Sequence, residues 1–444
     1  MLFLTGVAWL GLSGAPDEKG FWPVLLAALA LGLLVAKDRT GYSEVVIRGM
    51  SQQIVILMIM AWLLAGVLGT IMAGTGFVEA LVWLARQTGV SGGGYVAAAF
   101  LICCGVSTST GTSIGTILLC GPLLYPAGSA MSVEPAVLMG AILGGAVFGD
   151  NVSPISDTTI ASVLTQDAQI GEVVRSRLKY ALPAAGVSLV FYAALGGSAA
   201  AAGTGAEQVG SPQGLPMVVA PVLTVWLLLA RRHLLEGLLS GILAAAAIGL
   251  ALGLLEPSEL LYIDSESFSA KGIVLEGLER GVGASIFTLF LMGMVASIEA
   301  AGILGRVVEF ARKRTASPRG AELWIFGTVS AAVAITTHSA VAILTVGQFT
   351  RETGQRFGIS PSRRANLLDV TVCSFPFNLP YFVPVILAAS TSASGVDFGM
   401  PRVSPFETGF NNYHSWMLLV VVVLAIVTGF GRRPKPAGQE ELPR

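Results

Sequence analysis

The chain has 444 residues, of which 54% are hydrophobic and only 12% are charged, and its mean hydropathy is +0.75. Soluble domains carry about twice that charged fraction, so the composition excludes an ordinary cytoplasmic enzyme and predicts an all-α polytopic membrane protein. The 26 Lys and Arg and the 27 Asp and Glu give a net charge of −1, which excludes a globally basic nucleic-acid-binding protein. The lipid bilayer is the expected partner.

Because a bilayer crossing needs about 20 apolar residues, the hydropathy predicts about ten membrane spans. In chain order they lie near residues 2–15, 21–36, 53–72, 133–164, 178–201, 215–231, 234–254, 282–301, 366–390 and 415–431. Two further apolar stretches, 95–124 and 321–347, are interrupted by small polar residues, which predicts two re-entrant hairpins that enter and leave on one face.

The distribution of charge predicts the orientation of the spans. If the N-terminus is cytoplasmic and the hairpins return to their side of entry, most Lys and Arg fall in cytoplasmic loops, as the positive-inside rule requires. Arg177, Arg363 and Arg364 are assigned to those loops, and the tail 432–444 also lies inside. The basic residues that fall outside are Lys19, Arg86, Lys271, Arg280 and Arg402. The acidic loop 255–280 falls outside as well.

The order of the predicted elements repeats. After the N-terminal spans of residues 1–50, which are expected to form part of a scaffold, residues 51–201 contain a span, an amphipathic stretch, a hairpin, an interrupted span and a further span. Residues 202–281 link this unit to residues 282–431, which have the same order. Because the charges place the two hairpins on opposite sides, the units are predicted to be inverted repeats. That architecture is typical of secondary transporters, whose substrates bind near the midplane where broken helices meet.

Both hairpin tips are polar. The first reads STSTGTS over residues 107–113 and the second reads TTHS over residues 336–339. Unwound polar backbone at membrane depth is tolerated where it is buried in protein or lines a cavity, so we expect an ion or substrate site, with hydroxyls that bond back to the preceding turn as the alternative. The candidate residues are Ser107, Ser109, Thr110, Thr112, Thr337, His338 and Ser339. His338, the only histidine expected at membrane depth, is interpreted either as a titrating group or as a neutral packing residue.

The two interrupted spans carry the remaining candidates. Pro154 breaks the first span and frees backbone carbonyls, and Pro376 and Pro380 do the same in the second. The candidates are Asp150, Asn151, Ser153, Ser156, Asp157 and Thr158 in the first span, and Asp369, Ser374 and Asn378 in the second. Hard cations prefer such oxygen ligands, so Asp150, Asn151 and Asp157 are predicted to bind Na+. For Asp157, the cap of the following helix is the alternative.

An enzymatic alternative rests on the string GTSIG at residues 111–115, in which Ser113 with His338 would imitate an intramembrane serine protease. A nucleophile elbow needs a strand–turn–helix, which a membrane hairpin does not supply. No enzymatic activity and no cofactor other than a coupling ion are therefore expected.

Residues 148–159, FGDNVSPISDTT, resemble the hallmark of the NhaC-type sodium/proton antiporter family, and residues 365–369, ANLLD, with Leu379 and Pro380 resemble its second-half segment. The resemblance implies the wider ion transporter superfamily, with a scaffold that forms a homodimer in the bacterial inner membrane and a transport domain that moves like an elevator. It implies Na+/H+ antiport. The family also includes malate/lactate exchangers and amino-acid carriers, and many of its sodium/proton members have Lys where Asn151 stands. The alternative is therefore a Na+- or H+-coupled carrier of a small organic solute such as an amino acid or carboxylate.

Overall fold

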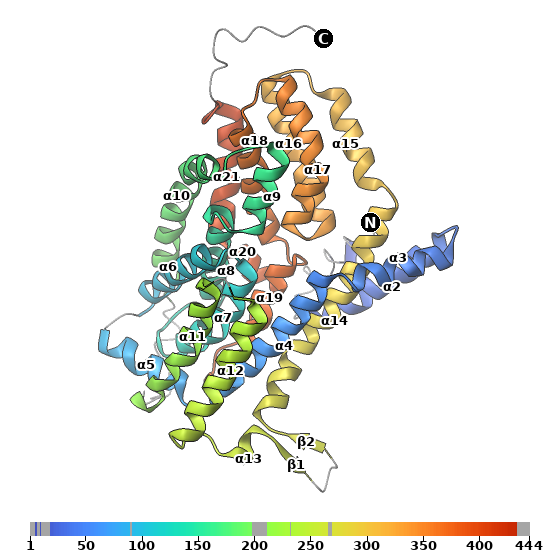
Figure 1. Cartoon of the computed structure of the whole chain (residues 1–444). Helices are drawn as coiled ribbons and strands as arrows, with labels where there is room; N and C mark the ends of the chain where they lie inside the picture. The colour runs from blue at the N-terminus through green and yellow to red at the C-terminus, as the bar shows by residue number, and fades with distance from the viewer. Residues whose placement is uncertain are drawn as a thin grey trace.

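The computed structural model describes residues 5, 6, 9, 18–88, 91–197, 211–230, 232–264 and 269–432. Over these residues the molecule is helical, apart from one two-stranded sheet and one isolated bridge. The sheet lies at the lower end of the molecule in Figure 1. The all-α fold predicted from the composition is confirmed.

The helices and strands follow one another in three parts, with η denoting a 3-10 helix. The first part contains η1 (Glu18–Gly20), α2 (Phe21–Val35), α3 (Arg39–Met50), α4 (Gln53–Gly74), α5 (Phe77–Thr88), α6 (Gly93–Thr110), α7 (Ser113–Ala127), η2 (Gly128–Ala130), α8 (Pro135–Val152), α9 (Asp157–Gln166) and α10 (Ile170–Leu195). The linking part contains η4 (Pro212–Val218), α11 (Val219–Leu229), α12 (Leu234–Ala251), α13 (Pro257–Leu260), β1 (Tyr262–Asp264) and β2 (Ser269–Lys271). The last part contains α14 (Ile273–Ala300), α15 (Ile303–Arg314), α16 (Pro318–Thr336), α17 (Ser339–Arg356), α18 (Pro361–Val372), η5 (Phe375–Asn378), α19 (Val383–Thr391), η6 (Ser392–Phe398), α20 (Pro405–Phe410) and α21 (Tyr413–Thr428).

The number of helices that can cross a membrane is close to the prediction. Of the described helices, 7 are long and apolar enough, or up to 8 if the bent pair built around α18 and α19 is one span. Two of the 7, Gly93–Thr110 and Ser113–Ala130, lie in the stretch predicted as the first hairpin and are not among the ten predicted spans. Shorter apolar helices at Phe21–Val35, Pro212–Leu227 and Tyr413–Thr428 coincide with three further predicted spans. The predicted span at 2–15 lies almost wholly outside the described residues. The chain is therefore a multi-span membrane protein.

Both predicted hairpins are present, and their tips are built alike. Gly111 ends α6 in the left-handed conformation at φ 70°, which glycine adopts without a steric penalty, and α7 starts at Ser113. Thr337 ends α16 at φ 52° and α17 starts at Ser339. A β-branched residue is strained in that region, so the second tip stores backbone strain where the first tip uses glycine.

Both helix breaks lie where the prolines predict them. α8 ends at Val152 and α9 begins at Asp157, on either side of Pro154, and the two helices continue in nearly one direction. In the second half, η5 separates α18 from α19, and the chain bends by 47°. A proline has no N–H to continue the helical hydrogen bonds, which is the local cause of both breaks.

The two hairpins enter from opposite ends of the molecule, as inverted repeats require. The base of α6 lies against the start of α8, because the Gly92 N–H donates to the Met131 carbonyl at 2.5 Å and Val133 bridges to Gly197. The α17 arm lies against the other end of the same long span, because the Gln166 amide donates to the Gly347 carbonyl at 3.0 Å. The order α4 to α10 is repeated by α14 to α21.

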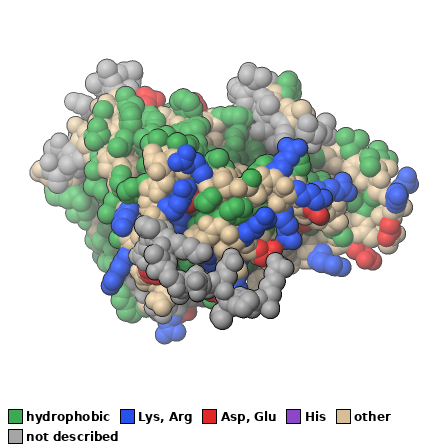
Figure 2. All heavy atoms as spheres, turned by 90° about the horizontal axis from the view of Figure 1, so that it is seen from above, with side chains coloured by type: hydrophobic (Ala, Val, Ile, Leu, Met, Phe, Trp, Pro, Cys, Tyr) green, Lys and Arg blue, Asp and Glu red, His purple; other side chains and the backbone are tan. Residues whose placement is uncertain are grey.

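Basic side chains gather at the end of the molecule opposite the sheet. Figure 2 looks onto that end, the top of Figure 1, and shows many Lys and Arg side chains there. Exposed basic residues of α10, α15 and α17 include Arg175, Lys179, Arg312 and Arg356. The assignment of Arg177, Arg363 and Arg364 to loops is wrong, because all three are at least 97% buried inside helices and bind acidic or amide side chains.

Four short elements, α3, α13, β1 and β2, were not expected from the sequence. Residues 39–50 form α3, whose Gly49 approaches the Met292 carbonyl of α14 so closely that an added Cβ would lie 2.5 Å from it. The acidic loop 255–280 contains α13, β1 and β2, and it ends in the first turns of α14.

Candidate functional site

The two hairpin tips and the two helix breaks meet around one cavity. Its empty space is about 700 Å³, including the open mouth. Its polar wall consists of Thr112, Ser113, Asp150, Asp157, Thr158, Thr337, His338 and Ser339. The apolar wall consists of Leu57, Met58, Ala61, Ile114, Leu234, Phe377, Phe382, Val383 and Pro384. Elements from both halves of the chain therefore form one site, which is the arrangement that the inverted repeat predicts.

Asp150 is held at the tip of the first hairpin. Its side chain accepts a hydrogen bond of 2.9 Å from the backbone N–H of Ser113, the first residue of α7. The N-terminus of a helix favours a negative charge, because its first N–H groups have no partner within the helix. The carbonyl of Asp150 accepts from the Thr158 hydroxyl at 3.1 Å, which ties the end of α8 to the start of α9. This carboxylate is 6% exposed and faces the cavity at a fixed position.

Asp157 lies at the first position of α9 and is exposed toward the cavity. The cap of that helix is Ser156, and no side chain forms a capping hydrogen bond there. The alternative interpretation of Asp157 as the helix cap is therefore wrong. Its carboxylate still benefits from the positive end of α9.

The second tip contributes Thr337, His338 and Ser339 to the cavity. The Nδ1 atom of His338 is buried and has no hydrogen-bond partner among the described residues. Within the described part of the chain, no Lys or Arg lines the cavity, so its ionisable groups are Asp150, Asp157 and His338. The site therefore has an acidic character that a cation would compensate.

Three predicted hydroxyls of the first hairpin do not line the cavity. The hydroxyl of Ser107 donates to the Ala146 carbonyl at 2.5 Å and binds α6 to α8. The hydroxyls of Ser109 and Thr110 donate to carbonyls of the preceding turn, Gly105 and Val106, at 2.8 and 2.9 Å. Ser109 and Thr110 therefore match the alternative in which hydroxyls bond back to the preceding turn, whereas Ser107 bonds to a neighbouring helix.

Asp369 and Asn151 form a buried cluster beside the cavity rather than part of its wall. The Arg177 Nη1 atom lies 2.9 Å from the Asp369 carboxylate, and both side chains are 0% exposed. The Asn151 amide donates to the same carboxylate at 2.9 Å. Asp369, a candidate site residue, is therefore paired with Arg177 and does not line the cavity.

Arg177 is a buried residue of this region that sequence reasoning missed. Its guanidinium donates to the Asn151 carbonyl at 2.8 Å, to the Thr159 hydroxyl at 2.6 Å and to Asn366 at 3.1 Å. The helix break after Val152 frees the Asn151 carbonyl from its helical hydrogen bond. Arg177 binds this carbonyl, so it is not left for a cation. The sequence offered one signal: the Asp369 carboxylate is energetically costly at membrane depth and therefore needs a partner. This cost does not identify which residue the partner is.

The remaining candidates lie near the breaks without lining the cavity. Ser153 and Ser156 are buried, and Ser156 shares a hydrogen bond of 3.0 Å with Thr158. Ser374 donates to the Thr371 carbonyl at 2.7 Å. The Asn378 amide atoms are buried and have no partner among the described residues.

A second buried histidine was not anticipated. His414 is 0% exposed in α21, and both of its ring nitrogens lack a partner in the described part of the chain. His338 is therefore not the only histidine in the protein interior.

Metal-ligand clusters give a further test of the site. In the described ranges, no group of three or more His, Cys, Asp and Glu side chains is placed to hold a metal ion. The oxygen ligands that the cavity wall offers are the carboxylates of Asp150 and Asp157 and the hydroxyls beside them.

Comparisons with known proteins agree with the motifs. A model of the Na+/H+ antiporter family matches residues 19–197. The chain is 25% identical over 181 residues to the malate-2H+/Na+-lactate antiporter of Bacillus subtilis, which covers 41% of this chain and 38% of that protein. It is 28% identical over 203 residues to the Na+/H+ antiporter NhaC of Alkalihalophilus pseudofirmus, with 43% and 42% covered.

A longer match extends into the second half. The chain is 25% identical over 347 residues to the arginine/ornithine antiporter ArcD of Halobacterium salinarum, which covers 74% of this chain and 70% of that protein. The first two matches span less than half of each relative. The family match includes residues 148–159 and therefore both cavity carboxylates. The chain is thus similar to Na+/H+ antiporters over residues 19–197, and to an antiporter of another substrate over a longer stretch.

Proposed function

We propose that the protein is a secondary antiporter that binds Na+ in the cavity between the hairpin tips and exchanges it for H+. The observation that carries this proposal is the pair of carboxylates, Asp150 and Asp157, in a cavity wall without a described Lys or Arg. A carboxylate at membrane depth costs about 2.5–3.5 kcal/mol on insertion scales when nothing compensates it. Each therefore gains from a bound cation or from a proton.

The ligand chemistry supports Na+. The oxygens of Asp150 and Asp157 are joined in the wall by the hydroxyl oxygens of Thr112, Thr158 and Ser339. Hard cations take carboxylate and neutral oxygen ligands of this kind. Because a proton and a Na+ ion compete for the same carboxylate oxygens, a site that must hold one or the other before it moves exchanges the two ions.

In this proposal the two hairpins form the two gates. Their arms come from opposite ends of the molecule and their tips meet at the cavity, so movement of the tips against α4 exposes the site to one side at a time. Bound Na+ or H+ neutralises the carboxylates and lowers the cost of an elevator-like movement past the lipid. The protein would work as a homodimer in the bacterial plasma membrane, with both termini cytoplasmic.

A second candidate is Na+-coupled exchange of a small organic solute. The rings of Phe377 and Phe382 pack edge to face with centroids 4.9 Å apart, and both residues line the cavity. An aromatic wall suits an organic molecule better than a bare ion.

The protease alternative receives no support from the geometry. Ser113 opens a helix that follows another helix, not the strand of a nucleophile elbow. The relatives of the chain are antiporters, which transport solutes rather than transform them.

Flux measurements on reconstituted protein test the proposal. Liposomes that contain the purified chain and a pH-sensitive dye should show proton movement when a Na+ gradient is applied. Asp157→Asn removes a cavity charge and should abolish that flux. Ser109→Ala is the matched control, because the Ser109 hydroxyl bonds within its own helix, and it should leave the flux unchanged. An Asp157→Asn variant with full Na+-driven proton flux would contradict the proposed role of the cavity.

A further inference from the structure

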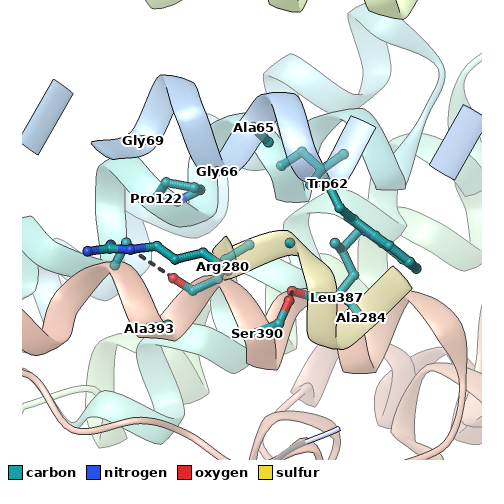
Figure 3. Close-up of a pocket in the computed structure, with 14 residues that line it drawn as sticks. Trp62, Ala65, Gly66, Gly69, Pro122, Arg280, Ala284, Leu387, Ser390 and Ala393 are labelled. Carbon is teal, nitrogen blue, oxygen red and sulfur yellow. Dashed lines mark hydrogen bonds between the residues drawn. The ribbon is translucent and has the colours of Figure 1, made fainter. Parts of the chain in front are cut away.

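A second cavity lies next to the first along the seam between α4, α7, α14 and the α19–η6 segment. Its empty space is about 450 Å³. Small residues form much of its wall, including Gly66, Gly69, Gly281 and Ala284. Figure 3 shows the Arg280 side chain extended along this cavity, away from Trp62. We call it the outer cavity, because its helix turns lie nearer the end of the molecule that carries β1 and β2.

The outer cavity continues the cavity between the hairpin tips. We call the cavity between the hairpin tips the inner cavity. On α4 the wall of the inner cavity ends at Ala61 and the wall of the outer cavity starts at Trp62. On α7 the inner wall ends at Ile114 and the outer wall starts at Leu118, one turn further on. On α19 Pro384 is followed by Leu387 in the same way. The two cavities are therefore lined by neighbouring residues of the same three helices.

Arg280 places a guanidinium in the wall of the outer cavity, whereas the cavity between the hairpin tips contains carboxylates. Its Nη2 atom is fixed by an ion pair of 2.9 Å with Asp397, which is itself 62% exposed. Its Nη1 atom is buried and has no partner among the described residues, and the same holds for the Nε1 atom of Trp62. A buried donor without an acceptor is unfavourable, so a ligand that supplies one is stabilised there.

The nearby hydroxyls do not supply that acceptor in the described structure. Ser390, Thr391 and Ser394 each donate to a carbonyl of their own turn, at 2.8, 2.7 and 2.8 Å. A carboxylate fits the vacant guanidinium edge, because arginine binds planar anions through parallel N–H groups. A bare Na+ ion would instead be repelled by the guanidinium.

We propose that the outer cavity binds the carboxylate of a small organic acid or amino acid through Arg280. The proposal specifies the solute of the second candidate function, Na+-coupled exchange of a small organic solute, as a carboxylate. It rests on that function. Asp397 holds the guanidinium in place and also competes for it. The site is chemically distinct from the acidic inner cavity, so binding of a carboxylate and binding of Na+ are separable.

Thermal unfolding of the purified full chain in Na+-free buffer tests the site. The probes are potassium L-lactate, potassium L-malate and L-alanine, each compared with its methyl ester. At least one probe should raise the apparent Tm by mass action, and its ester should not. Arg280→Gln should weaken the apparent affinity for that probe about tenfold or more, the effect expected for a charge-assisted hydrogen bond.

The controls separate this site from the inner cavity. Arg280→Gln should keep the Tm increase caused by NaCl, whereas Asp157→Asn should lose that increase and keep the one caused by the carboxylate. Asp397→Asn frees the guanidinium and should tighten carboxylate binding, which provides a test even if Arg280→Gln does not fold. No stabilisation by any probe, equal stabilisation by the esters, or unchanged affinity in Asp397→Asn and Arg280→Gln would overturn the inference.

Discussion

The ion pair between Arg177 and Asp369 allows a sharp test of how the interior is held together. Arg177 on α10 contacts α18 through Asp369 and Asn366, and it contacts the break between α8 and α9 through the Asn151 carbonyl. Arg177→Met keeps the length and apolar part of the side chain and removes every one of these donors. It leaves the Asp369 carboxylate buried without a cation.

The expected cost is large. Removing one partner of a buried ion pair destabilises a protein by about 3–5 kcal/mol, because the remaining charge stays desolvated. Both side chains are 0% exposed, so solvent does not screen the loss. At about 2 °C per kcal/mol for a long chain, the apparent Tm of Arg177→Met should fall by about 6–10 °C.

A double-mutant cycle isolates the pair. Asp369→Asn alone leaves the arginine buried without its anion and should also destabilise strongly. The double variant Arg177→Met with Asp369→Asn contains neither charge, so it should be less destabilised than the sum of the single variants by at least about 1 kcal/mol. The measurement is thermal unfolding of the purified variants in one detergent.

The same double variant tests where Asp369 acts. Because Asp369 does not line the cavity, the folded double variant should keep the Tm increase caused by Na+. Additive single effects would refute the coupling between Arg177 and Asp369. Loss of the Na+ effect from a folded double variant would refute the assignment of Asp369 to a structural cluster.

Two further predictions concern the hairpins. Gly149→Ala should destabilise the protein by about 1–3 kcal/mol, because the added Cβ would lie 2.1 Å from the Ser107 backbone. The control is Gly105→Ala, because nothing lies within 4 Å of a Cβ added there. Equal unfolding temperatures for the two variants would contradict the prediction. Thr337→Gly should raise the unfolding free energy by up to about 1 kcal/mol, because it relieves the left-handed conformation at φ 52°. A clear fall in thermal stability would show that the Thr337 side chain contributes more than its strain costs.

Local chemistry made several features predictable from the sequence. Pro154 and Pro376 lack an N–H to continue a helix, and the breaks are found there, although Pro122 and Pro183 lie inside unbroken helices. Gly111 permits the left-handed turn that closes the first hairpin. These effects act within a few residues, so no knowledge of the rest of the fold is needed to predict them.

The candidate site was predictable only in part. Asp150 and Asp157 were identified because carboxylates are costly at membrane depth, and both face the cavity. Ser109 and Thr110 donate to carbonyls of α6 and do not line the cavity, whereas Thr112, two residues further on, caps α7 and does line it. The direction in which a hydroxyl points depends on the turn geometry and on the neighbouring helix, which residue type alone does not reveal.

The sequence by itself therefore determined that this is a membrane protein, where its helix breaks and hairpins lie, and which two carboxylates face its cavity. Each of these features follows from hydropathy or from local backbone chemistry. Only the tertiary structure decided the partners of the buried charges. Asn151 and Asp369 are 218 residues apart in the chain and hydrogen-bonded in space, and Arg177 joins them from a third helix. Such contacts are set by the packing of distant helices, and the same packing leaves one nitrogen of Arg280 without a described partner.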